Sequence, residues 1–182
     1  FMLDTSAPVG VSASVSRDFR DIGGVMYFDG VPTVSVRATD AGVGILEYVV
    51  GSEKNSDGKF ELGSGTYTVK VQDRLGNVSS VVGLGKLLGG SSDTVVVDTS
   101  APSISESAGF DGDYTEDGKI WYSSIPDLAY TVRDSYLYRV TAYVNGKDMK
   151  YSDLTSGEFK IDLTGISDGK NIVRLVAEDK AG

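Results

Sequence analysis

Apolar residues alternate with small or polar residues along much of this chain, and a period of two is the signature of β-strands that bury one face. No stretch shows the period of an amphipathic helix of about ten residues or more. The pattern therefore predicts an all-β protein. The alternating segments lie at 9–15, 34–38, 67–71, 128–132, 140–144, 159–163 and 173–177.

Turn motifs separate the predicted strands at short intervals. Asn145-Gly146 is a strong hairpin signal, because the two central residues of such a turn both need positive φ. Asp57-Gly58, Asp117-Gly118 and Asp168-Gly169 are weaker motifs of the same kind. Short strands spaced by roughly 8 to 12 residues are typical of a β-sandwich or a β-barrel.

The segment 78–93 departs from the alternation. It holds four glycines with three leucines between them. Glycine inside a strand is typical of a bulge, because it offers no side chain to pack. The sequence therefore predicts either an extended loop before a last strand at 94–97 or a bulge that splits that strand.

The chain also repeats itself at an offset of 94 residues. The motif D-T-S-A-P occurs at 4–8 and again at 98–102. One register that persists over so many positions predicts two copies of one unit, at 1–97 and 98–182. Further matches pair Gly24 with Gly118, Met26-Tyr27-Phe28 with Ile120-Trp121-Tyr122, Asp40 with Asp134 and, after a gap, Asp73 with Asp179.

The composition excludes several kinds of chemistry. The 182 residues include neither histidine nor cysteine, which rules out disulfides, thiolate metal sites and nucleophiles activated by histidine. The 26 acidic residues offer many carboxylate pairs for glycoside hydrolysis, but the sequence distinguishes none of them. We therefore expect that the protein is not an enzyme.

The charge and the hydropathy pattern limit the partners. A formal net charge of −9 repels phosphate backbones, so nucleic acid is not an expected partner. No run of about 18 apolar residues is present, so we expect no membrane insertion.

Two motifs resemble a known family. The segment 159–182 contains D-G-x-N, then alternating apolar residues, then A-E-D-K-A-G, and 95–102 reads V-V-V-D-T-S-A-P. Both resemble the closing half and the joint of bacterial immunoglobulin-like repeats. The resemblance implies two tandem immunoglobulin-like β-sandwich domains of an extracellular or cell-surface protein. Such repeats are strung along adhesins, surface-layer-like proteins and extracellular glycan-active enzymes, mostly as spacers or stalks and sometimes as binding modules.

The two ends of the chain lead to a further expectation. The chain opens with Phe1-Met2-Leu3-Asp4 and shows no signal peptide, so we expect an excised piece of a longer protein. It stops at Gly182, where the family continues with asparagine and a final strand. If that strand is missing from the second domain, one sheet has an exposed edge that is prone to pair with another chain.

The linker Asp98-Thr99-Ser100-Ala101-Pro102 has two interpretations. As a structural joint, Asp98 caps a turn and Pro102 keeps Ala101 extended. As a metal site, Asp98 binds calcium at the joint together with Asp73 or Asp40, and calcium needs six or more oxygen ligands. Calcium at this joint is the one cofactor that we consider.

Aromatic and acidic clusters complete the candidates. Trp121 and Tyr122 match Tyr27 and Phe28, so we expect a core role for them, whereas Tyr136 and Tyr138 have no aromatic counterparts and are candidates for stacking on a ligand such as a sugar ring. The acidic segment 111–118 lacks the glycine and the glutamate of a calcium-binding EF-hand loop, so we interpret it as a solvated loop.

These observations lead to a structural hypothesis and to one alternative. The chain is expected to be a spacer or stalk of tandem modules in a bacterial surface or secreted protein, with the neighbouring modules of the same chain as its partners. The alternative is a module that binds a carbohydrate or a host surface receptor, in an adhesin or beside a glycan-active enzyme.

Overall fold

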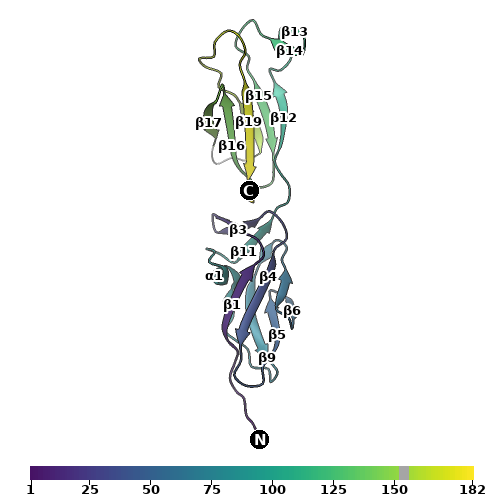
Figure 1. Cartoon of the computed structure of the whole chain (residues 1–182), viewed down its shortest axis with the longest axis vertical. Coiled ribbons are helices and arrows are strands. Elements are labelled where there is room, and N and C mark those ends of the chain that lie inside the picture. The colour runs from purple at the N-terminus through teal and green to yellow at the C-terminus, as the bar shows by residue number, and fades with distance from the viewer. Residues whose placement is uncertain (152–155) are drawn as a thin grey trace. The chain divides into compact units, whose positions relative to one another are not determined.

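The computed structural model describes residues 1–151 and 156–182, and its regular secondary structure is almost wholly β-strand (Figure 1). A single short helix, α1 (Leu84–Leu88), occurs in this described part of the chain. The predicted all-β class is therefore confirmed. The chain divides into two compact units: unit 1 is Phe1–Thr99 with Ala181–Gly182, and unit 2 is Ser100–Lys180.

Unit 1 contains three sheets, with strand orders β1-β4-β7, β10-β9-β5-β6 and β2-β3-β11-β8. All the paired strands are antiparallel except β11 and β3, which run parallel. The strands are β1 (Val9–Val15), β2 (Arg20–Ile22), β3 (Val25–Phe28), β4 (Thr33–Thr39), β5 (Ile45–Val50), β6 (Glu53–Asn55), β7 (Lys59–Glu61), β8 (Gly65–Thr66), β9 (Thr68–Asp73), β10 (Val82–Gly83) and β11 (Thr94–Val97).

The alternation explains how unit 1 builds its core. Val34 and Val36 on β4 point to the same face as each other, and so do Val69 and Val71 on β9, because side chains two apart share a face of a strand. All four side chains are buried in one cluster with Phe28. Each such side chain contributes about 1.5–3 kcal/mol on full burial.

The segment 78–93 is neither of the two forms predicted for it. It forms β10 and then α1, which ends in the left-handed residue Gly89. Leu84 is fully buried against the core of unit 1, and Leu87 and Leu88 pack beside it. The three leucines therefore cover the core from a helical turn, which is a role that the glycine content concealed.

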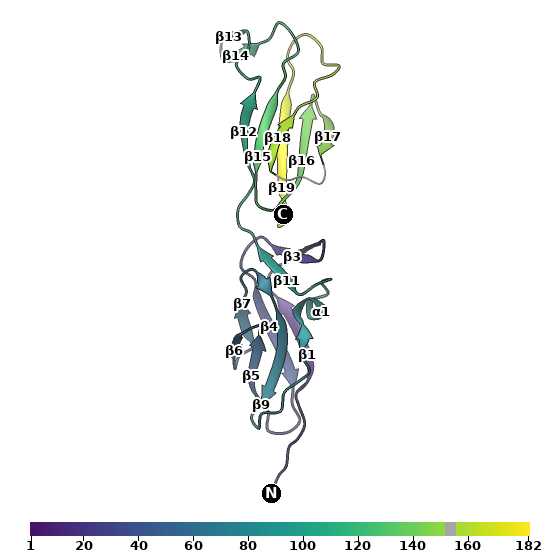
Figure 2. The ribbon, with the colours of Figure 1, turned by 180° about the vertical axis from the view of Figure 1, so that it is seen from behind.

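Unit 2 contains sheets with strand orders β12-β15-β18, β13-β14 and β17-β16-β19, all antiparallel. Figure 2 shows β18 beside β15. The strands are β12 (Ser103–Ala108), β13 (Tyr114–Glu116), β14 (Lys119–Trp121), β15 (Ala129–Arg133), β16 (Leu137–Val144), β17 (Lys147–Tyr151), β18 (Gly157–Lys160) and β19 (Val173–Asp179).

The core of unit 2 consists of two clusters. One surrounds Leu128, Ala142, Ile161 and Leu163, and the other surrounds Val132, Leu137, Val140 and Phe159. Leu175 on β19 packs against both clusters. Unit 2 therefore has its own buried core, separate from that of unit 1.

Two of the four predicted turn motifs connect the strands of a hairpin, and the other two do not. Asn145 and Gly146 both have positive φ, 51° and 84°, between the paired strands β16 and β17, and Asp117-Gly118 does the same between β13 and β14. Asp57-Gly58 and Asp168-Gly169 were wrong as hairpin signals. Each lies between strands of different sheets, so the chain crosses there instead of folding back on its neighbour.

The repeat is visible in one pair of hairpins. In β2–β3, Arg20 is opposite Tyr27, and in β13–β14, Tyr114 is opposite Trp121, so both pairs keep the offset of 94 residues. The core role expected for Trp121 is wrong, because this side chain is exposed, whereas Tyr122 is half-buried. The hairpin is shared by the two units, but the burial of its second strand is not.

Candidate carboxylate site

Three aspartates from separate segments meet in unit 1. Asp4 precedes β1, Asp40 follows β4 and Asp73 ends β9. One carboxylate oxygen from each residue lies within 4.8 Å of the other two. We call these three residues the carboxylate cluster.

Asp73 is the innermost member of the cluster and is fully buried. Its Oδ1 accepts hydrogen bonds from the N–H groups of Leu75 and Asn77, both at 2.8 Å, and its Oδ2 accepts one from the side-chain amide of Asn77 at 2.7 Å. Burial by itself raises the pKa of the Asp73 carboxyl, but these bonds, with one from Gly76, together outweigh burial and hold that pKa below its usual value. Asp73 is therefore a carboxylate at neutral pH.

Asp40 closes the turn that follows β4. Its Oδ2 accepts hydrogen bonds from the N–H groups of Gly42 at 3.1 Å and Gly44 at 2.8 Å. Its Oδ1 is buried and has no hydrogen-bond partner within the part of the chain that the structure describes. A buried carboxylate oxygen without a partner is costly, so this atom is the point in the cluster where a ligand is needed most.

Asp4 brings the segment before β1 to the same place. Its Oδ2 accepts a hydrogen bond from the N–H of Val43 at 2.9 Å, and its Oδ1 accepts one from Ser6 at 3.0 Å. Gly42 makes this approach possible, because a Cβ at that position would overlap the Asp4 carboxylate. The chain thus places a glycine where a carboxylate has to pass.

The negative charge of the carboxylate cluster is not balanced by any positive side chain in the part of the chain that the structure describes. Among the described residues, neither lysine nor arginine forms an ion pair with any member of the cluster; the ion pairs join residues elsewhere, such as Arg17 with Asp29. Three carboxylates at this separation repel one another unless a cation lies between them. The donor set consists only of oxygen, which suits a hard divalent cation such as calcium.

The structure brings two of the predicted metal ligands together. Asp40 and Asp73 meet Asp4, a residue that the sequence analysis did not assign to a site. Asp98 is a buried residue that follows β11, and its N–H donates to the carbonyl of Phe28 at 2.9 Å. Calcium binding by Asp98 at the joint stays a prediction. The repeat of Asp4 as Asp98 was the signal that would have pointed to Asp4.

The counterparts of the cluster in the second copy keep some of its local features. Asp134 follows β15 as Asp40 follows β4, and its Oδ1 accepts a hydrogen bond from the N–H of Tyr136 at 2.6 Å. Asp179 ends β19 as Asp73 ends β9, and it is also buried.

The other candidate residues are placed as follows. Tyr138 is exposed and Tyr136 is half-buried. Neither lines the groove of unit 2 that lies between residues 120–126 and 166–169. Their role in ligand binding stays a prediction. In the linker Asp98–Pro102, Thr99, Ser100 and Ala101 are exposed.

The acidic segment 111–118 is exposed at nearly every residue, and its second half forms the β13–β14 hairpin. The N–H and the hydroxyl of Ser123 donate to Asp113 at 2.6 and 2.8 Å and lower the pKa of its carboxyl. The carboxylate of Asp113 thus connects the residue before β13 to Ser123, which follows β14.

Comparisons with known proteins do not place the chain in a family. No protein-family model matches it, and no curated protein matches its sequence. Within the described residues, no helix is long and apolar enough to span a membrane.

Proposed function

We propose that the chain is a structural spacer made of tandem immunoglobulin-like modules in a bacterial surface or secreted protein, and that each module uses a divalent cation to fasten its entry segment. The modules hold other parts of the protein apart, and they have no catalytic role. Calcium is the cation that we propose, because the cluster offers only oxygen ligands.

The observation that carries this proposal is the convergence of Asp4, Asp40 and Asp73 at positions that the internal repeat duplicates. Asp4 lies in the segment that enters unit 1, whereas the other two lie at the ends of β4 and β9. A cation that binds all three ties the entry segment to the body of the module. Such a link stiffens a joint, and a stiff joint is what a spacer requires.

The residues that the two copies share also favour a structural role. They lie in a hairpin, in core strands and in turns, and they include the three aspartates of the carboxylate cluster. A binding or catalytic site that served the parent protein would be expected among the shared residues, but Tyr136 and Tyr138 stand where the first copy has Gly42 and Gly44.

The test is a calcium titration of the chain by isothermal titration calorimetry. Asp40→Asn is the sharpest variant, because the amide oxygen of asparagine can keep the turn bonds from Gly42 and Gly44 while its NH₂ replaces the unpartnered oxygen. We expect the wild type to bind calcium. In Asp40→Asn, we expect the calcium affinity of the site in unit 1 to fall by at least about tenfold.

Asp57→Asn is the matched control for this titration. Asp57 also caps a turn, by accepting from the N–H of Lys59 at 3.2 Å, but it does not belong to the cluster. We expect this variant to bind calcium as the wild type does. Equal calcium binding by Asp40→Asn and the wild type would refute the cation site.

The carbohydrate- or receptor-binding alternative makes a different prediction. Specific binding to a glycan array that is lost in the double variant Tyr136→Ala, Tyr138→Ala would favour this alternative over the spacer. We expect no specific glycan binding by the chain.

A further inference from the structure

The turn between β16 and β17 contains Asn145-Gly146, the one Asn-Gly pair in the sequence. Asparagine is a chemically labile residue, and it is most open to attack by the following backbone nitrogen when that nitrogen belongs to glycine, which has no side chain in the way. Both residues are exposed, so water reaches them. No atom of the described residues lies within 4 Å of the place that a Cβ of Gly146 would take. Packing therefore does not shield this turn.

Two hydrogen bonds hold the side chain of Asn145. Its Oδ1 accepts from the N–H of Ile172 at 2.9 Å, and its Nδ2 donates to Oδ1 of Asn171 at 2.8 Å. A backbone N–H can only donate, so the contact with Ile172 determines which end of the Asn145 amide is the oxygen. The NH₂ group of Asn145 must therefore face Asn171.

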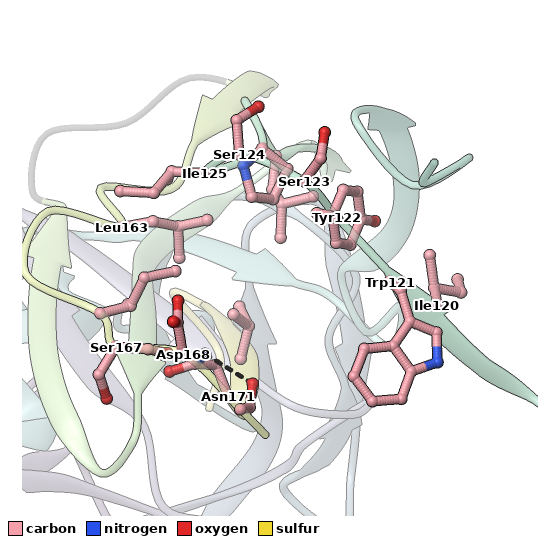
Figure 3. A pocket seen from close by; sticks show the side chains of 15 residues that line it. Ile120, Trp121, Tyr122, Ser123, Ser124, Ile125, Leu163, Ser167, Asp168 and Asn171 are labelled. Atoms are coloured by element: carbon pink, nitrogen blue, oxygen red, sulfur yellow. Dashed lines mark hydrogen bonds between the residues drawn. The ribbon is translucent and has the colours of Figure 1, made fainter. Parts of the chain in front are cut away.

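The amide of Asn171 is oriented in the same way by backbone groups. Its Nδ2 donates to the carbonyl of Ser167 at 2.9 Å and to that of Gly169 at 3.2 Å (Figure 3). Carbonyl oxygens only accept, so an amide turned by half a rotation would place Oδ1 against both of them. Oδ1 of Asn171 thus has to face Asn145, and only a hydrogen-bond donor fits opposite it. Position 145 requires an amide and not an acid.

We propose that Asn145 is a site of spontaneous deamidation and that Asn171 protects it. In this reaction the backbone nitrogen of Gly146 forms a bond to Cγ of Asn145, and the bond from Cγ to Nδ2 breaks. Nδ2 leaves as ammonia, with the proton that Gly146 gives up. Water then opens the cyclic imide to give aspartate or isoaspartate. Nothing is oxidised or reduced, and solvent water is the only co-reactant.

The two side-chain bonds of Asn145 oppose this reaction at different points. Nδ2 cannot leave while it donates to Asn171, and Cγ cannot turn toward Gly146 while Oδ1 accepts from Ile172. The reaction has to wait for a local opening in which both bonds are broken, so its rate falls with the population of that opening. Two hydrogen bonds of ordinary net strength correspond to a factor of about ten or more.

The product of the reaction disturbs the same network. An aspartate at position 145 places a second oxygen opposite Oδ1 of Asn171, and at neutral pH neither oxygen carries a proton to donate. An isoaspartate also adds a methylene to the backbone, which does not fit the two-residue turn between β16 and β17. Deamidation therefore separates this turn from the segment 167–172, which precedes β19. Both asparagines lie outside the carboxylate cluster, so the proposal does not rest on the cation site.

The test incubates the 182-residue chain at neutral pH beside a peptide of residues 142–148, in which the turn has no partner. Mass spectrometry of proteolytic fragments measures how fast Asn145 is converted to the acid. We expect the reaction in the chain to be at least about tenfold slower than in the peptide. Asn171→Ala removes the partner of Nδ2 and is expected to raise the rate in the chain by about tenfold.

Asn55→Ala is the matched control. Asn55 also holds a loop with its amide, since it accepts from the N–H of Gly58 at 2.8 Å and donates to the carbonyl of Lys59 at 2.6 Å. It lies in unit 1, and its amide has no bond to Asn145. We expect this variant to leave the deamidation rate of Asn145 unchanged.

Asn145→Asp supplies the product in a defined form. Hydrogen exchange of the β19 amides that pair with β16 measures how often unit 2 opens. We expect exchange in this variant to be at least about tenfold faster than in the wild type. The added effect of Asn145→Asp should be much smaller in the Asn171→Ala background, because the opposing oxygen is then absent. A general defect of the turn would have the same effect in both backgrounds.

Three results would overturn the proposal. The first is deamidation of Asn145 at equal rates in the chain and in the peptide. The second is an Asn171→Ala variant that keeps its β19 amides protected and deamidates as slowly as the wild type. The third is an Asn145→Asp variant whose hydrogen exchange matches that of the wild type. This last measurement decides alone if Asn171→Ala fails to fold, because it leaves Asn171 in place.

Discussion

At the scale of single residues, the carboxylate cluster depends on a few local choices. Asp40 and Asp73 each use backbone N–H groups to fix their carboxylates, and Gly42 leaves room for Asp4. The hydrogen bonds keep Asp73 ionised in a buried place, so the charge is part of the folded state. This arrangement links the stability of unit 1 to pH.

We predict a loss of stability in acid that depends on Asp73. Its folded pKa lies below the ordinary value of 3.8, so the stabilisation by its charged form is present above pH 3.8 and is lost as pH falls through the lower folded pKa. Urea unfolding of the wild type and Asp73→Asn, in the presence of a chelator, measures this effect. The difference in unfolding free energy between them should be larger at pH 7 than at pH 2. A difference that does not change with pH would contradict this linkage.

The sequence could suggest only part of this cluster. Asp40 and Asp73 were candidates only as partners of Asp98 in a calcium site at the joint, and the pattern gave no sign that the segment before β1 returns to them. The hydrogen bond from Val43 to Asp4 spans residues far apart in the chain, and such a contact depends on how the sheets pack. The repeat of D-T-S-A-P was visible, but we assigned it only to the joint between the copies.

At the scale of elements, the period of two was a reliable guide wherever one face of a strand is buried. β4, β9 and β19 all follow it, because alternate side chains enter a core. The pattern of apolar residues gave no sign of α1, since a helix of five residues is too short to show a period. It also failed for Trp121, because burial of a strand depends on the strand beside it, which a local pattern does not show.

We predict that α1 matters for the stability of unit 1 through Leu84. This side chain is fully buried in the core of unit 1, so Leu84→Ala removes buried carbon atoms and leaves a cavity. The expected loss is about 2–5 kcal/mol of unfolding free energy, measured by urea titration. Leu46→Ala on the exposed side of β5 is the control, with an expected change within about 0.5 kcal/mol. Equal effects would show that α1 does not complete the core.

At the scale of the whole molecule, the duplication is the main feature. Each unit buries its own apolar clusters, and the two hairpins keep one register. The copies have also diverged: α1 belongs to unit 1, and the groove beside β14 belongs to unit 2. The sequence showed the shared positions, but only the structure shows where a matching position has a different environment.

Thermal unfolding in calcium and in chelator tests the cation-fastened module most directly. A ligand that binds only the folded state raises the unfolding temperature, and a large excess of calcium over its dissociation constant corresponds to a rise of about 5 °C or more. We predict such a rise for the wild type and a much smaller one for Asp40→Asn. Wild-type unfolding curves that coincide in calcium and in chelator would contradict a cation bound by Asp4, Asp40 and Asp73.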